Sequence, residues 1–260
     1  MPDRVALITG ASAGIGAELA RVFAANGHRV ALVARRAERL HELAGSLTGA
    51  AARPPIVMAC DLSQPEAGDA IAAALAAQRV EPDYVVNNAG FGLVGPAATI
   101  ERAAQLAMID VNVRALTELS LRFADSLERH HGGVLNVASV AGFLPGPNMA
   151  VYYASKAYVI SFSEALHHEF GRRGVRVTAL CPGPVPTEFQ ARAGFRPGRR
   201  SLIPALSARA VAEAGYRGLM DGRRLVVPGL ANRLVPQVMR MVPRGLALAL
   251  VGRFQARRAR

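Results

Sequence analysis

Cysteine, long apolar runs and lysine are all scarce in this sequence, and the first two scarcities exclude classes of protein. Cys60 and Cys181 are the two cysteines among 260 residues, and each ends an apolar run typical of a strand. We expect both to be small buried side chains rather than a disulfide or a metal-binding pair. No apolar run reaches the roughly 18 residues that a transmembrane helix needs. The chain also does not open on the basic and then apolar residues of a secretory signal, so we expect a cytoplasmic protein.

The scarcity of lysine is the most informative of these features. Lys156 is the one lysine among 31 basic residues, and Tyr152 precedes it by four positions. A helix over this segment places the two side chains on one face, one turn apart. An ammonium beside a phenol lowers the phenol pKa and favours proton donation, whereas the guanidinium fork of arginine suits carboxylates and phosphates. The pair therefore predicts proton transfer at Tyr152 rather than a solvated helix face.

Short apolar segments alternate with helical patterns along the chain. The hydrophobic content of 51% is ample for a large core, and the length fits a single α/β domain. The segments that we predict as strands are 5–9, 30–34, 56–59, 84–86, 134–137, 175–180 and 225–227. Helical patterns run through Leu19 to Phe23 and over 35–47, 100–128 and 152–170. This alternation predicts an α/β fold with a buried parallel sheet and helices on both faces.

A glycine-rich turn joins the first predicted strand to the first predicted helix. Gly10, Gly14 and Gly16 follow the strand in the order G-x-x-x-G-x-G. Glycines in such a turn let a phosphate approach the backbone, and the helix that follows offers free N–H groups and the positive end of its dipole. The spacing differs from the commoner G-x-G-x-x-G. Its position at the first strand–helix junction nevertheless favours dinucleotide binding over simple chain reversal.

Further motifs occur in order at the ends of later strands. The complete set is Thr9-Gly10-Ala11-Ser12-Ala13-Gly14-Ile15-Gly16, Asp61-Leu62, Asn87-Asn88-Ala89-Gly90, Asn112, Ser139, Tyr152-x-x-x-Lys156 and Pro182-Gly183. With these motifs the chain resembles the short-chain dehydrogenase/reductase family from residue 1 to about residue 228. Ser139 precedes Tyr152 by thirteen residues, which is the spacing of that family. The resemblance implies a Rossmann-like, doubly wound parallel sheet of about seven strands.

The resemblance also implies a role for each catalytic residue. Tyr152 would donate a proton to a carbonyl oxygen, and Ser139 would hydrogen-bond the same oxygen. Lys156 would hold the nicotinamide ribose hydroxyls and lower the Tyr152 pKa. Asn112 would position a water that connects Lys156 to solvent, and a helix-kink role for its amide is compatible with this. Tyr153 lacks a lysine four residues later and is expected to serve packing.

The end of the second predicted strand indicates the cofactor. NAD-binding chains commonly carry an acid there, whereas NADP needs a cation for its 2′-phosphate. Here Arg35 and Arg36 follow the strand and no acid is present, which favours NADP(H). Two arginines also suit the start of a solvated helix, so the missing acid is the stronger argument. The other expected cofactor contacts are Gly10, Ser12, Gly14, Ile15, Gly16, Asp61, Leu62, Asn88, Ala89, Gly90, Tyr152, Lys156, Pro182, Gly183, Val185 and Thr187.

The segments expected to surround the substrate are mostly apolar. They are 91–95, 141–149 and 184–203, beyond the carboxyl ends of the strands. Their large apolar residues are Phe91, Leu93, Val94, Phe143, Leu144, Met149, Phe189 and Phe195. This favours a hydrophobic ketone or aldehyde over a sugar. Residues 194–200 are typical of a mobile lid, whose arginines suit an anionic substrate group and water equally well.

The basic excess is concentrated at the C-terminal end. No acid follows Asp221, whereas nine arginines lie between Arg223 and Arg260. Apolar residues at helical spacing run from 230 to 242 and again over 246–251, and Pro236 and Pro243 are expected to kink or split this helix. We therefore divide the chain into a catalytic domain, 1–228, and a basic amphipathic helical extension, 229–260.

Three contacts suit this extension: an anionic membrane surface, the body of the enzyme, or a sister subunit. Nucleic acid is not expected, because the arginines adjoin aliphatic side chains and no stacking platform is present.

On these grounds we expect the activity of an NADPH-dependent carbonyl reductase, and the resemblance implies a homodimer or homotetramer. One alternative is a 3-ketoacyl reductase of lipid metabolism whose basic surface docks an acidic acyl carrier. The other is a non-catalytic, NADP-sensing peripheral membrane protein. The intact set of Ser139, Tyr152 and Lys156 argues against the second alternative.

Overall fold

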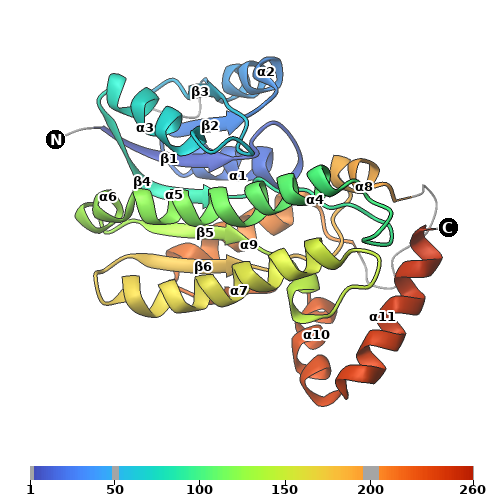
Figure 1. Cartoon of the computed structure of the whole chain (residues 1–260). Helices are drawn as coiled ribbons and strands as arrows, with labels where there is room; N and C mark the ends of the chain where they lie inside the picture. Colours follow the sequence, from blue (N-terminus) through green and yellow to red (C-terminus); the bar gives the residue numbers. More distant parts are fainter. Residues whose placement is uncertain (1–2, 49–52, 196–204, 260) are drawn as a thin grey trace.

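A parallel sheet forms the centre of the computed structural model, which describes residues 3–48, 53–195 and 205–259 (Figure 1). The strands of this described part are β1 (Asp3–Thr9), β2 (Val30–Ala34), β3 (Ile56–Ala59), β4 (Val80–Asn87), β5 (Gly133–Val137), β6 (Arg176–Leu180) and β7 (Leu225–Val226). They form one sheet in the order β3-β2-β1-β4-β5-β6-β7, and all neighbouring strands are parallel. The order reverses between β1 and β4, where ligands of such sheets bind. The predicted doubly wound parallel sheet is confirmed.

Alternation along the strands explains why helices cover both faces of the sheet. In β1, Ala6 and Ile8 join one buried cluster, and Val5 and Leu7 join the other, as the two-residue period of a strand requires. The first cluster lies under α1 (Gly14–Ala25), α2 (Ala37–Leu47) and α9 (Ala208–Met220). The second lies under α3 (Ala67–Ala77), α5 (Leu116–Arg122), α6 (Ala124–Arg129) and α7 (Ala150–Gly171). Helices α3 and α9 are absent from the sequence-based prediction, because alanines make their apolar faces hard to recognise.

The helical stretch predicted over 100–128 contains a widened turn. It begins with α4 (Arg102–Ile109), continues through the π-helical turn η1 (Asp110–Ala115) into α5, and is interrupted at Phe123 before α6. Asn112 lies within the π-helical turn and is fully buried. Such single turns are frequent at functional sites, and this one turns the Asn112 amide toward the loop after β4.

Two short elements and two C-terminal helices complete the described chain. The short elements are the 3₁₀ turn η2 (Val140–Phe143) after β5 and α8 (Glu188–Ala193) after β6. The C-terminal pair is α10 (Leu230–Met241) and α11 (Arg244–Ala259). Pro243 lies between these two helices, whereas α10 continues through Pro236. This pair of helices lies beyond the carboxyl ends of β5 and β6, at one corner of the molecule (Figure 1).

A buried row of polar side chains connects the strand ends to the covering helices. Asn87 and Asn136 are paired in register on β4 and β5, and the Asn87 amide donates to Oδ1 of Asn136 at 2.9 Å. The Asn136 amide donates to Ser163 of α7 at 2.9 Å. A further bond of 2.9 Å joins Asn87 to Ser120 of α5. Buried polar groups with partners add specificity to a core, whereas groups left unpaired are costly.

We expect Asn136→Ala to lower the free energy of unfolding by about 2–4 kcal/mol, because it removes one hydrogen-bond partner from the Asn87 amide and one from the Ser163 hydroxyl, at about 1–3 kcal/mol each. The matched control is Gln78→Ala, at an exposed position after α3, which should change stability by less than about 0.5 kcal/mol. Urea unfolding of the three proteins measures both values. Equal effects of the two substitutions would contradict a structural role for the row.

Candidate active site

One large cavity opens at the carboxyl ends of the strands, with a volume of ≈ 1010 Å³. The residues predicted from the sequence that line it are Gly10, Ser12, Gly14, Ile15, Arg35, Arg36, Asp61, Leu62, Asn88, Ala89, Gly90, Ser139, Tyr152, Lys156, Pro182, Gly183, Val185 and Thr187. Gly16 and Asn112 are the two predicted residues that lie behind this wall. Segments separated by more than 100 positions in the sequence therefore meet in one place.

The glycine-rich turn approaches the end of β4 very closely. A Cβ atom at Gly16 would overlap the carbonyl oxygen of Gly10 and the amide nitrogen of Asn88. Gly10 has a φ of 66°, which glycine adopts without strain. Within the described residues no side chain caps the first turn of α1, so its N–H groups remain available to a ligand.

Thr9 and Asn88 fasten this turn to the neighbouring strand. The Thr9 hydroxyl accepts hydrogen bonds from the backbone N–H groups of Asn88 and Ala89, both at 3.0 Å. The Asn88 amide donates to the Thr9 carbonyl at 2.9 Å. Sequence reasoning assigned Thr9 no separate role, because its contacts cross from β1 to a segment nearly 80 positions away.

Two arginines and an aspartate lie at the β2 side of the cavity. The Arg36 guanidinium donates to the Ser12 hydroxyl at 3.1 Å and pairs with Glu188 of α8 at 3.0 Å. Arg35 is exposed. Burial acts to raise the Asp61 pKa, but hydrogen bonds from Ser63 and the charge of Arg35 outweigh it and hold that pKa below its ordinary value. The Asp61 carboxylate is therefore ionised at neutral pH, with cationic groups beside it.

Ser139 and Tyr152 meet at the centre of the cavity. Ser139 lies two residues after β5, where its hydroxyl accepts a hydrogen bond from the Ala141 N–H at 3.1 Å. Burial raises the pKa of Tyr152 to about 12, and a hydrogen bond with the Ser139 side chain counteracts part of this rise. Tyr152 is thus fully protonated near neutral pH and can donate a proton.

Lys156 is buried and hydrogen-bonded to the end of β5. Its ammonium donates to the Val137 carbonyl at 2.8 Å and lies 5.9 Å from the centre of the Tyr152 ring. Burial lowers the Lys156 pKa to about 8, because a low-dielectric environment disfavours the charged form. Burial of the phenol is the main cause of the raised Tyr152 pKa. The effect of Lys156 on the Tyr152 pKa stays a prediction, with the ammonium bonded to the Val137 carbonyl.

Asn112 holds the loop after β4 from behind. Its amide oxygen accepts from the Phe91 N–H at 3.1 Å, and its nitrogen donates to the Phe91 carbonyl at 3.0 Å. The same nitrogen donates to the Ser155 hydroxyl at 3.0 Å. A Cβ atom at Gly90 would lie 2.9 Å from this amide oxygen and 3.4 Å from the Lys156 nitrogen, so Gly90 separates the two polar groups. Asn112 thus joins the π-helical turn to the loop after β4 and to α7.

The half of the cavity that lies between Arg36 and Lys156 fits a dinucleotide. The uncapped N-terminus of α1 suits a pyrophosphate, and Arg35 and Arg36 suit a further phosphate. Asp61 accepts two hydrogen bonds from Ser63 through one carboxylate oxygen, which leaves the other oxygen for a donor.

The other half of the cavity has an apolar wall, and the two C-terminal helices supply part of it. Phe91, Leu144, Met149, Phe189 and Phe195 line it, as predicted. Leu93, Val94 and Phe143 are not part of the wall, and the predicted lid positions 196–200 lie outside the described residues. The C-terminal helices add Val235, Met239, Leu250, Val251, Arg253 and Gln255.

Gln255 is the polar residue of this wall that sequence reasoning missed. It is 1% exposed, and its amide nitrogen donates to the Tyr153 hydroxyl at 2.6 Å. Its amide oxygen is buried without a hydrogen-bond partner among the described residues. The sequence shows an uncharged polar residue in an arginine-rich helix, which could have marked Gln255 as a buried position. Its place beside Tyr153 depends on the packing of α11.

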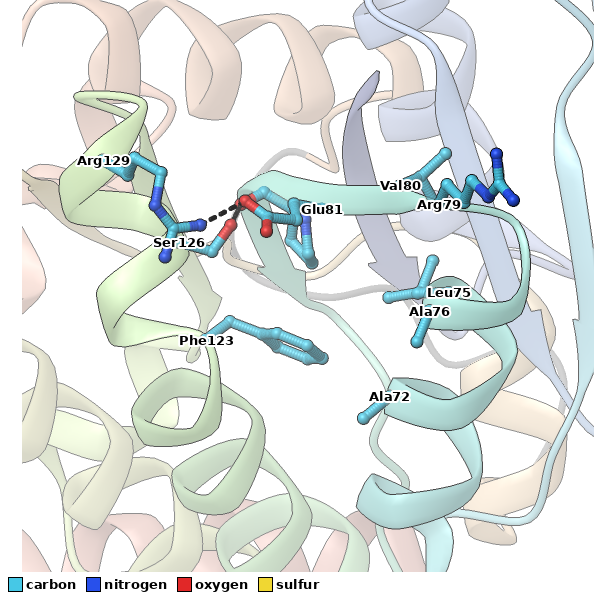
Figure 2. A pocket seen from close by; sticks show the side chains of 10 residues that line it. Ala72, Leu75, Ala76, Arg79, Val80, Glu81, Phe123, Ser126 and Arg129 are labelled. Atoms are coloured by element: carbon cyan, nitrogen blue, oxygen red, sulfur yellow. Dashed lines mark hydrogen bonds and ion pairs between the residues drawn. The ribbon is translucent and has the colours of Figure 1, made fainter. Parts of the chain in front are cut away.

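A second cavity, of ≈ 370 Å³, lies at the amino end of β4 (Figure 2). Leu75 of α3 and Phe123 face it, and Glu81 and Arg129 point toward one another and form an ion pair at its rim. The Ser126 hydroxyl donates to the Pro82 carbonyl at 2.6 Å. The predicted catalytic residues all lie at the opposite end of the sheet.

Comparison with known proteins agrees with the geometry. The short chain dehydrogenase family model matches residues 4–195. A sulfoacetaldehyde reductase of Chromohalobacter salexigens is 36% identical over 215 residues, which cover 81% of this chain and 79% of that protein.

Solved structures resemble nearly the whole chain. A short-chain dehydrogenase from Sphingobium yanoikuyae in complex with NADPH has a TM-score of 0.80 and 30% identity over 94% of each chain. A bulky-bulky ketone specific alcohol dehydrogenase from Comamonas testosteroni has a TM-score of 0.74 and 27% identity over 94% of this chain and 95% of that one. Together with the family model, these likenesses show that the chain belongs to the short-chain dehydrogenase family of oxidoreductases.

Proposed function

We propose that the chain is an NADPH-dependent carbonyl reductase that interconverts a hydrophobic ketone or aldehyde and its alcohol. The observation that carries this proposal is the meeting of Ser139, Tyr152 and Lys156 between the two halves of one cavity. One half has the glycine turn and the arginines, and the other has the apolar wall. The relative from Sphingobium yanoikuyae that binds NADPH supports the choice of cofactor.

Each catalytic side chain has a role that its surroundings favour. NADPH supplies the hydride when it is bound. Tyr152 gives its hydroxyl proton to the carbonyl oxygen, and Ser139 stabilises the charge that develops on that oxygen. Lys156 holds the nicotinamide ribose hydroxyls and stabilises the Tyr152 phenolate that remains. Asn112 keeps Gly90 and Phe91 in place and orders a water beside Lys156, through which Tyr152 regains its proton.

The substrate class follows from the wall opposite the glycine turn. Its aromatic and aliphatic side chains favour an apolar substrate, and the ketone specificity of the relative from Comamonas testosteroni agrees with this. Arg192 and Arg253 also line the cavity, which keeps a ketoacyl thioester with an anionic carrier as the second candidate. A screen of hydrophobic carbonyl compounds and acyl thioesters with NADPH, followed by loss of absorbance, distinguishes the two candidates.

We also propose that residues 1–228 form the body of the catalytic domain, that the extension 229–260 belongs to the same domain because it helps to enclose the cavity, and that the enzyme is a homodimer or homotetramer. Leu106, Ile109, Leu121 and Tyr158 are large apolar side chains left exposed on α4, α5 and α7. We infer that these side chains contribute to the contact between subunits.

We expect NADPH to bind at least tenfold more tightly than NADH, because one charge-assisted bond to the 2′-phosphate contributes about 1.5–3 kcal/mol. Arg35→Ala and Arg36→Ala should each remove much of this preference and leave NADH affinity unchanged. Arg39→Ala is the matched control, because Arg39 is exposed, pairs with Glu42 and does not line the cavity. Fluorescence titration measures all affinities. Equal binding of the two cofactors to the unaltered protein would refute the assignment.

Tyr152→Phe should lower kcat by about 10²–10⁴-fold, because it removes the transferred proton, while NADPH affinity stays nearly the same. Tyr153→Phe retains the ring and loses the bond to Gln255, so we expect a change in KM with little change in kcat. Steady-state kinetics and cofactor titration separate these effects. An inactive Tyr153→Phe variant together with an active Tyr152→Phe variant would show that Tyr153, not Tyr152, donates the proton.

The rate of carbonyl reduction should fall as pH rises through about 8, the Lys156 pKa. Below that pH the group is an ammonium that stabilises the phenolate, and above it the charge is lost. Tyr152, with a pKa of about 12, stays protonated over this range and cannot cause the fall. A pH–rate profile on both sides of pH 8 tests this, and a flat profile would contradict it. Lys156→Arg keeps a charge at all these pH values but should be inactive, because a guanidinium does not fit the site of the ammonium.

A further inference from the structure

The helical hairpin formed by α10 and α11 is docked on the body by its inner side. Asn232 of α10 is buried, and its amide donates to the Pro228 carbonyl at 2.7 Å. Ala247 and Gln255 of α11 are also buried, and Gly252 faces Pro147. The hairpin therefore has a fixed orientation, and its opposite side is a defined surface.

The outer side of the hairpin is apolar and exposed. Leu230, Leu234, Val238 and Met241 recur at intervals of three and four residues, which places them on one face of α10. Their exposed fractions are 79%, 63%, 50% and 86%. Leu246 of α11 is also exposed, at 53%. We call these five side chains the outer stripe. Val235, which shares their sequence pattern, lines the cavity instead.

Unpaired positive charge accompanies the outer stripe. Arg223 and Arg224 pair with Asp221 and Glu164. By contrast, Arg233 and Arg244 are exposed, and neither of them pairs with a carboxylate of the described residues. The sequence after Asp221 contains no acid that could neutralise them.

We propose that the outer stripe docks on an anionic lipid surface, with Arg233 and Arg244 contacting lipid headgroups. Apolar side chains beside unpaired arginines are the pattern of helices that lie in the membrane interface. No helix in the described part of the chain is long and apolar enough to cross a membrane, so the hairpin lies on the surface. The inner side of the same hairpin lines the cavity.

A second copy of the chain is the less suitable occupant. A two-fold contact through the outer stripe would bring the same surface of both copies together. The unpaired arginines of each copy would then face those of the other, and like charges oppose such a contact. The exposed residues of α4, α5 and α7 offer a different apolar surface for self-association.

Flotation of the full-length protein with lipid vesicles tests the proposal directly. The protein should float with vesicles of phosphatidylcholine and phosphatidylserine at low salt, and high salt should weaken this binding by shortening the Debye length. Vesicles of phosphatidylcholine alone should bind poorly. Protein that stays at the bottom of the gradient with anionic vesicles at low salt would overturn the proposal.

Two variants that each lose two positive charges show whether vesicle binding depends on the arginines beside the outer stripe. Arg233→Gln with Arg244→Gln should weaken binding to anionic vesicles roughly tenfold or more. Arg102→Gln with Arg172→Gln removes the same charge from exposed positions on α4 and after α7, and it should bind nearly as the unaltered protein does. Equal losses in the two variants would show general electrostatic attraction and overturn docking through the hairpin.

The apolar contribution is tested by Leu234→Ser with Met241→Ser. This variant should lose vesicle binding at both salt concentrations while thermal unfolding and NADPH binding in solution stay unchanged. Sedimentation measures its mass in parallel. Vesicle binding that persists together with a reduced oligomeric mass would assign the outer stripe to a second copy and overturn the proposal. Because vesicle binding is independent of turnover, its failure is distinguishable from failure of the proposed reductase activity.

Discussion

The active site depends on how one buried ammonium is accommodated. Lys156 is 5% exposed, and its hydrogen bond to the Val137 carbonyl ties α7 to the end of β5. That attachment places Tyr152, one turn earlier on α7, beside Ser139, two residues beyond β5. A guanidinium is broader than an ammonium and would not fit between the helix and the strand end. This explains why lysine persists at this position in a chain that otherwise uses arginine.

Side-chain amides hold the loops that surround this centre. Asn88 ties the glycine turn to β4, Asn112 holds the backbone at Phe91, and Asn136 links β5 to α7. An amide can donate and accept at once, so each one joins segments that share no regular secondary structure. The glycine turn and the loop after β4 are therefore held by side chains, although few of their backbone groups belong to the sheet.

The C-terminal hairpin has two faces with different surroundings. One face packs on the body and contributes Val235, Met239 and Gln255 to the cavity wall. The other face leaves Leu230 and Met241 largely exposed. The hairpin thus belongs to the catalytic cavity as much as to the surface, and a division of the chain at residue 228 separates it from a cavity that it helps to enclose.

The sequence by itself determined the parallel sheet, the glycine turn, and the Tyr152–Lys156 pair, because each depends on a local pattern. The two-residue and 3.6-residue periods are properties of neighbouring positions, and short motifs at strand ends are gathered whenever the strands are parallel. Only the tertiary structure decided the pKa of Tyr152, the contact of Gln255 with Tyr153, and the side of α10 that faces the cavity. These depend on burial and on contacts between segments up to about 100 positions apart. Their energies arise from packing among distant elements, which no local pattern records.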